Sequence, residues 1–170
     1  MDSAAQIIVA AELTQDSNDK RQLAPMLERV EQNMGAKPEA ATADAGYCSE
    51  NQLNDARVKG VELYVATGKQ KHGLPETADV VSSGENPVAS DSAVAQMKRK
   101  LKTETGQAVY KMRKAIVEPV FGQIKAARGI RAFLLRGLVK VSAEWKLICA
   151  AHNLLKMFRS GYRPQTAQMA

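Results

Sequence analysis

Short apolar segments alternate with helical patterns over residues 1–66, and this alternation constrains the fold more than any other feature of the chain. Three segments have the small and β-branched residues that favour strands: 6–13, 40–44 and 61–65. Between the first two, residues 20–34 carry apolar side chains at helical spacing. Strands that alternate with helices predict an α/β layer with parallel pairing.

Polar and turn residues mark the expected helix ends in this region. Asp19 precedes the helix predicted over 20–34 and is expected to cap it, and Gly35 is expected to end it. Ser49 is followed three residues later by Gln52, which is the pattern of a capping box. A short helix is therefore expected after the second strand.

The remainder of the chain divides into a loop and a helical part. Residues 67–90 are rich in Gly, Pro and Ser, which predicts a surface loop. Three helices are expected after it, over 91–104, 106–127 and 138–159. Pro119 lies within the second of them and predicts a kink or break near Glu118. The sequence thus predicts one domain with a core at 1–66, a loop at 67–90 and a helical part at 91–170.

Charge is distributed very unevenly between the two halves of the chain. Residues 1–90 contain 8 Lys and Arg against 14 Asp and Glu, a net charge of −6. Residues 91–170 contain 16 against 4, a net charge of +12, and the two values sum to the +6 of the whole chain. The basic half predicts contact with a polyanion such as DNA; the alternative is a set of solvated helix faces.

Several classes of site and location are disfavoured by the sequence. The two cysteines, Cys48 and Cys149, and the two histidines, His72 and His152, have no metal-type spacing, so zinc and disulfide frameworks are not expected. His152 lies on an apolar helical stripe and is expected to be a hydrogen-bonded core residue. The chain starts without a signal peptide and has no apolar run of about 18 residues, which predicts a cytoplasmic protein with no membrane partner.

Asp44 is the first candidate site residue. It follows the apolar segment 40–43, and side chains at the carboxyl ends of parallel strands escape the packed layers. Gly46 permits a tight turn after it. The alternative is that Asp44 caps the following turn or helix.

Glu118 is the second candidate, because it is the only acid between Glu104 and Glu144. On a regular helix, Lys114 and Lys125 would share its face. The alternative is that the three residues form exposed salt bridges, which stabilise a helix little.

These residues resemble motifs of bacterial insertion-sequence transposases of the DDE class. The segment Ala43-Asp44-Ala45-Gly46-Tyr47-Cys48-Ser49-Glu50-Asn51 resembles their second-aspartate motif. The family's Tyr-Arg-Glu-Lys signature is matched by Tyr110, Arg113, Glu118 and Lys125. The family's C-terminal end is resembled by Arg128-Gly129-Ile130-Arg131, Phe133 and Ala151 to Lys156. One spacing departs from the signature: four residues separate Arg113 from Glu118, so Lys114 holds the standard position of the arginine.

The resemblance implies a ribonuclease H-like fold, here a partial domain with a short mixed sheet, flanking helices and a helical, basic C-terminal half. It implies Mg²⁺, with Mn²⁺ as a substitute, held by Asp44 and Glu118 as two of three catalytic acids. It also implies binding of transposon-end DNA in the bacterial nucleoid. The DNA contacts it implies are Tyr110, Arg113, Lys114, Lys125, Arg128 and Arg131.

The family's first catalytic Asp lies on a strand before residues 6–13, and Met1 comes after that point. The sequence therefore predicts a transposase that is truncated and inactive alone. A second hypothesis is a non-catalytic DNA-binding or regulatory fragment that pairs with a full-length transposase or with itself. A third is an unrelated basic α/β protein.

Overall fold

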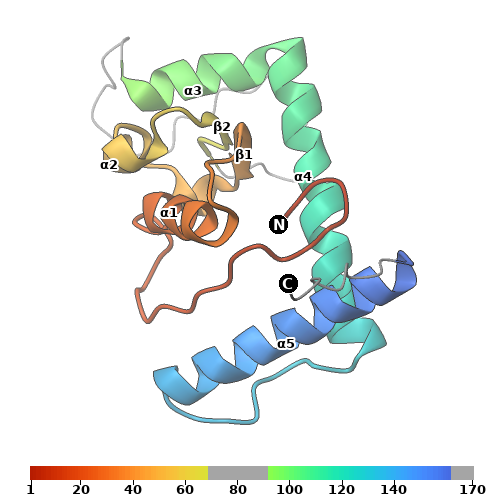
Figure 1. Cartoon of the computed structure of the whole chain (residues 1–170). Coiled ribbons are helices and arrows are strands. Elements are labelled where there is room, and N and C mark those ends of the chain that lie inside the picture. Colours follow the sequence, from red (N-terminus) through yellow and green to blue (C-terminus); the bar gives the residue numbers. More distant parts are fainter. Residues whose placement is uncertain (69–91, 162–170) are drawn as a thin grey trace, which may run out of the picture. The chain divides into compact units, whose positions relative to one another are not determined.

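The computed structural model describes residues 1–68 and 92–161, and its elements are labelled in Figure 1. The chain forms two compact units. We call Asp16–Arg113 the sheet unit, and Met1–Gln15 with Lys114–Ala170 the helical unit. Each is described by itself. The loop predicted at 67–90 lies almost wholly outside the described residues, and the three-part division of the chain remains a prediction.

The sheet unit contains two parallel strands, as the alternation predicted. Strand β1 (Ala40–Ala43) pairs with β2 (Glu62–Val65), with Ala40 opposite Glu62 and Ala43 opposite Val65. The backbone pairing continues one step further, where the Ala66 N–H donates to the Ala43 carbonyl at 3.1 Å. Two of the three predicted strands are thus confirmed, and the sheet they form is parallel rather than mixed.

Helices and short turns surround this sheet. The longer helices are α1 (Leu23–Met34) and α3 (Ala93–Lys102), and the short elements are η1 (Ala45–Tyr47), α2 (Glu50–Leu53) and η2 (Ala56–Val58). The Ser49 side chain accepts a hydrogen bond from the Gln52 N–H at the start of α2, which confirms the predicted cap. Gly35 ends α1 in the left-handed conformation at φ 73°, as its position predicted.

The predicted cap of α1 is wrong. The N-cap residue is Gln22, which makes no side-chain capping bond. A turn comes first, in which the Gln22 N–H donates to the Asp19 carbonyl at 3.0 Å. Asp19 is thereby placed one turn too early to cap, and its carboxylate lies near Gly46 instead.

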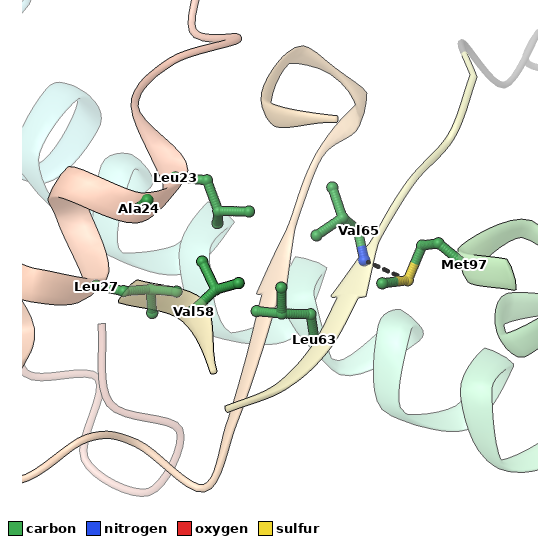
Figure 2. Packing of buried hydrophobic residues seen from close by; sticks show 7 residues of the cluster. All are labelled: Leu23, Ala24, Leu27, Val58, Leu63, Val65 and Met97. Atoms are coloured by element: carbon green, nitrogen blue, oxygen red, sulfur yellow. Dashed lines mark hydrogen bonds between the residues drawn. The ribbon is translucent and has the colours of Figure 1, made fainter. Parts of the chain in front are cut away.

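Figure 2 shows the core of the sheet unit. Buried side chains from α1, η2, β2 and α3 pack together there: Leu23, Ala24, Leu27, Val58, Leu63, Val65 and Met97. The Val65 N–H donates to the Met97 sulfur at 3.4 Å, which joins the helix to the edge of the strand. This packing holds the carboxyl end of the sheet in place, and Asp44 is the residue that follows β1.

The helical unit begins with a segment that was predicted to be a strand and is not one. Residues 6–13 form no strand in the structure. Instead, Asn153 of α5 (Leu138–Arg159) accepts from the Ile8 N–H and donates to the Ile8 carbonyl, both at 2.9 Å. One side-chain amide thus supplies the two bonds that a neighbouring strand would supply, so the extended backbone is satisfied without a sheet.

Helix α4 (Glu104–Gly122) runs through Pro119 without a break, and the predicted alternative of a kink stays a prediction. Proline has no N–H to give to the carbonyl four residues earlier, which is that of Ala115. The Gln6 side-chain amide donates to this carbonyl at 3.0 Å. The helix therefore tolerates Pro119 because a residue from the chain's first turn replaces the missing donor.

Regular α-helix geometry ends instead at η3 (Gln123–Ala127), which is a turn of π-helix. The Arg128 N–H donates to the Gln123 carbonyl five residues earlier at 3.1 Å. Around these helices lies a second core of Ile8, Val120, Ile124, Ile148 and Cys149. Among the described residues, no helix has the length and hydropathy needed to cross a membrane.

Candidate DNA-binding and acidic site

Asp44 occupies the position that the sequence predicted, directly after β1 at the carboxyl end of the strand. It also caps η1, because its Oδ1 accepts from the Gly46 N–H at 3.2 Å. Asp44 therefore both follows the strand end and caps the next turn, which the sequence had presented as alternatives. Its side chain is about half exposed, at 51%, so the second oxygen remains accessible to a ligand.

The turn after Asp44 brings a second carboxylate close. A Cβ placed on Gly46 would lie 3.3 Å from Oδ1 of Asp44 and 3.7 Å from Oδ2 of Asp19. The pKa of the Tyr47 hydroxyl is raised above its usual value by burial first, and then by the negative charges of Asp19 and Asp44. The electrostatic environment of this turn is therefore acidic.

Arg113 of α4 supplies the cation that faces Asp44. Its Nη1 lies 3.8 Å from Oδ2 of Asp44, and its guanidinium lies 5.6 Å from the centre of the Tyr110 ring. The Arg113 side chain is 24% exposed, and its Nε is buried without an acceptor among the described residues. A buried donor without a partner is costly.

Glu118 and the remaining cations of the predicted site belong to the helical unit. Glu118, Lys114 and Lys125 are all exposed. Within the described ranges Glu118 pairs with neither lysine, so the predicted alternative of helix-surface salt bridges is not observed. Glu118 and Lys125 were predicted to share one helix face because regular α-helical spacing was assumed. The π-helical turn that begins at Gln123 alters this spacing.

Arg128 and Arg131 follow this turn. Arg128 donates to Nδ1 of His152 at 3.2 Å, whereas Arg131 is exposed. His152 is fully buried, and its Nε2 donates to the Gln6 carbonyl at 3.3 Å. The prediction that His152 is a hydrogen-bonded core residue is confirmed.

Folding stability is expected to fall as the pH drops below about 6.5, the usual value for histidine. Burial lowers the pKa of His152, with smaller contributions from the nearby Arg128 and Lys156 charges and an opposing one from Gln6. The unfolded chain therefore takes up a proton at a higher pH than the folded chain does. Urea unfolding, followed through the single Trp145, should give lower midpoints at pH 5.5 than at pH 7.5.

The matched comparison for this prediction is His152→Gln, which keeps a hydrogen-bonding side chain and removes the titration. The variant should lose the change between pH 7.5 and 5.5. An equal change in both proteins would exclude His152 as its cause.

No group of three or more His, Cys, Asp or Glu residues in the described part of the chain is arranged to hold a metal ion. Asp44 has the oxygen chemistry of a magnesium ligand, but one of its oxygens caps η1 and the other faces Arg113. Asp44 and Glu118 belong to different units, and the expectation that they bridge a metal remains a prediction. By itself, the acidic turn of the sheet unit is not a complete metal site.

Comparison with protein families identifies the stretch that carries most of these residues. Residues 83–158 match the family model described as Transposase DDE domain. This stretch is similar to the DDE domain of transposases. The match includes the Tyr110 to Lys125 signature together with Arg128 and Arg131, whereas Asp44 lies before it. No curated protein and no solved structure matches the chain.

The DDE transposase family typically has a ribonuclease H-like fold, uses a divalent metal and binds DNA. The described residues form a mixed α/β structure, in which several helices accompany a two-stranded parallel sheet. The family resemblance that was inferred from sequence motifs is therefore confirmed.

Proposed function

We propose that the chain is part of a transposase catalytic domain that binds transposon-end DNA, with Asp44 and Glu118 as two of its three metal-binding acids. The observation that carries the proposal is Arg113, which lies beside Asp44 and has a buried donor without an acceptor. A phosphate oxygen is an acceptor of the right charge for this guanidinium.

The divalent metal would activate a water or a 3′-hydroxyl and stabilise the leaving oxygen. The chain's own residues have other roles. Arg113 would bind and orient a phosphate, held in place by the Tyr110 ring and Asp44. The contact with Asp44 supports Arg113, rather than the exposed Lys114, as the arginine of the signature.

The basic helical half supports the DNA-binding part of the proposal. Lys125, Arg128 and Arg131 are cations of this half that contact no acid in the described part of the chain. Lys100 is a poorer candidate, because its Nζ lies 3.2 Å from Glu62 and donates to the Leu63 carbonyl. The DNA contacts we propose are therefore Tyr110, Arg113, Lys114, Lys125, Arg128 and Arg131.

We expect weak, largely sequence-independent DNA binding that falls steeply with salt. If three cations each neutralise one phosphate, raising the salt from 50 to 200 mM should weaken binding about fortyfold, because each contact releases counterions. Fluorescence anisotropy of a labelled duplex measures this change. Equal affinity at both salt concentrations would contradict DNA binding through this half.

The second candidate function is a regulatory fragment that binds DNA without cutting it. Its support is that the described residues hold no complete metal site. Binding to transposon ends without cleavage, in competition with an active transposase, would favour this alternative.

A further inference from the structure

A hollow in the helical unit has not yet been given a role. Its volume is about 750 Å³, and it lies between the first turn of the chain and the last turns of α5. Ala4, Ala5 and Ile7 form part of its wall, and its charged residues are Arg128, Lys156 and Arg159. No acid is among the described residues that line it.

The contacts of these cations leave their charges uncompensated. Arg128 donates to His152, whose lowered pKa keeps the imidazole neutral. Lys156 donates to the neutral Oε1 of Gln6 at 2.7 Å. Arg159 is exposed and forms no ion pair within the described ranges.

The C-terminal end of α5 accounts for only part of the positive charge around the hollow. Lys156 and Arg159 lie in the last turn of α5, where cations are favoured by the partial negative charge of about one half at a helix C-terminus. Three full positive charges exceed that partial charge. The same charges of Arg128 and Lys156 also lower the pKa of His152, after the larger effect of burial.

Hydrogen bonds already hold two of the cations of the hollow in place without a ligand. Gln6 is fixed by three partners, which are the Ala115 carbonyl, His152 and Lys156. These bonds hold the amine of Lys156 in one place, and His152 does the same for the guanidinium of Arg128. Cations that are already ordered lose little conformational entropy when they bind an anion.

We propose that this hollow is a phosphate-binding site, lined by Arg128, Lys156 and Arg159, that takes a backbone phosphate of DNA. It adds Lys156 and Arg159 to the proposed DNA contacts, and both follow the Tyr110 to Lys125 signature in the sequence. The inference rests on the proposed function in one respect, that the phosphate belongs to DNA.

The test compares two double variants with the same loss of charge. Lys156→Gln/Arg159→Gln removes two cations of the hollow, whereas Lys111→Gln/Lys140→Gln removes two exposed cations that do not line it. In duplex titrations at about 50 mM salt, the first pair should lower affinity about tenfold or more. It should also reduce the magnitude of the slope of log affinity against log salt by about 0.9, which is the value for one phosphate contact. The control pair should change both values much less.

A second readout comes from His152 by NMR. A bound phosphate should raise the His152 pKa in the wild-type chain, because it offsets the charges of Arg128 and Lys156. Arg159→Gln alone is a safe variant for folding, since Arg159 is exposed, and it should reduce this rise.

Three outcomes would overturn the inference in distinguishable ways. If DNA binds and the two double variants weaken it equally, the hollow is not a DNA contact, although the proposed function stands. If the wild-type chain does not bind DNA, the proposed function fails as well. If inorganic phosphate raises the His152 pKa but DNA does not, the hollow binds free anions only, and its assignment to DNA is wrong.

Discussion

A preparation of the 170-residue chain is expected to leave transposon-end DNA uncut with either Mg²⁺ or Mn²⁺. Asp44 and Glu118 supply two carboxylates, and no group of three ligands is present in the described part of the chain. Two-metal phosphodiester chemistry needs ligands that fix both ions. The measurement is a gel assay of labelled transposon ends, with an active transposase as the positive control.

If the coding region continues upstream with an acid-bearing strand, the longer chain should cleave these ends. Asp44→Asn or Glu118→Gln in that chain should then reduce cleavage more than about a hundredfold, because even residues that only support a metal ligand cost 10–100-fold when lost. DNA binding should stay within a few-fold of the parent. Cleavage by the 170-residue chain that disappears with Glu118→Gln would show instead that an acid within these residues completes the site.

Gly106→Ala is expected to be the most damaging of the glycine substitutions. A Cβ at this position would clash with the Lys100 carbonyl oxygen and would lie 3.0 Å from Oγ1 of Thr103. The Gly106 N–H donates to the same Thr103 oxygen at 3.0 Å, so the corner between α3 and α4 cannot open without losing that bond. Overpacking of this kind costs about 1–3 kcal/mol, and more where backbone is the obstacle.

The matched control is Gly122→Ala. Gly122 has helical backbone angles, and nothing lies within 4 Å of its added Cβ. The substitution should stabilise the chain by roughly 0.5–1 kcal/mol, because alanine is the better helix former. Thermal unfolding by circular dichroism should therefore move in opposite directions for the two variants. A similar shift for both would mean that the α3–α4 corner yields more easily than its contacts imply.

The parts of the fold that the sequence predicted depend on local chemistry. The strands at 40–43 and 62–65, the Ser49 cap and the end of α1 at Gly35 are each specified by a few adjacent residues. The position of Asp44 at the end of β1 was predicted in the same way, because a strand end followed by a glycine turn is visible in the sequence. The DDE family was recognised from motif spacing, and the match to residues 83–158 agrees with it.

The errors have a common physical cause, which is a partner distant in the sequence. Residues 6–13 form no strand, and Asn153, 145 residues after Ile8, satisfies the Ile8 backbone in place of a neighbouring strand. Pro119 fails to break α4 because Gln6, 109 residues before Ala115, replaces its missing donor. The contact between Arg113 and Asp44 could not be predicted from the motif either, because the standard spacing places Lys114 at the arginine position.

The bonds of the first eight residues also bear on how the chain folds during synthesis. Gln6 and Ile8 are synthesised at least 145 residues before their partners at His152, Asn153 and Lys156. Contacts this far apart in sequence are slow to form, because the intervening loop must close first. The bonds of Gln6 and Ile8 to α5 therefore cannot form until residues 152–156 have been synthesised, and until then Ile8 lacks the part of its core that α5 supplies.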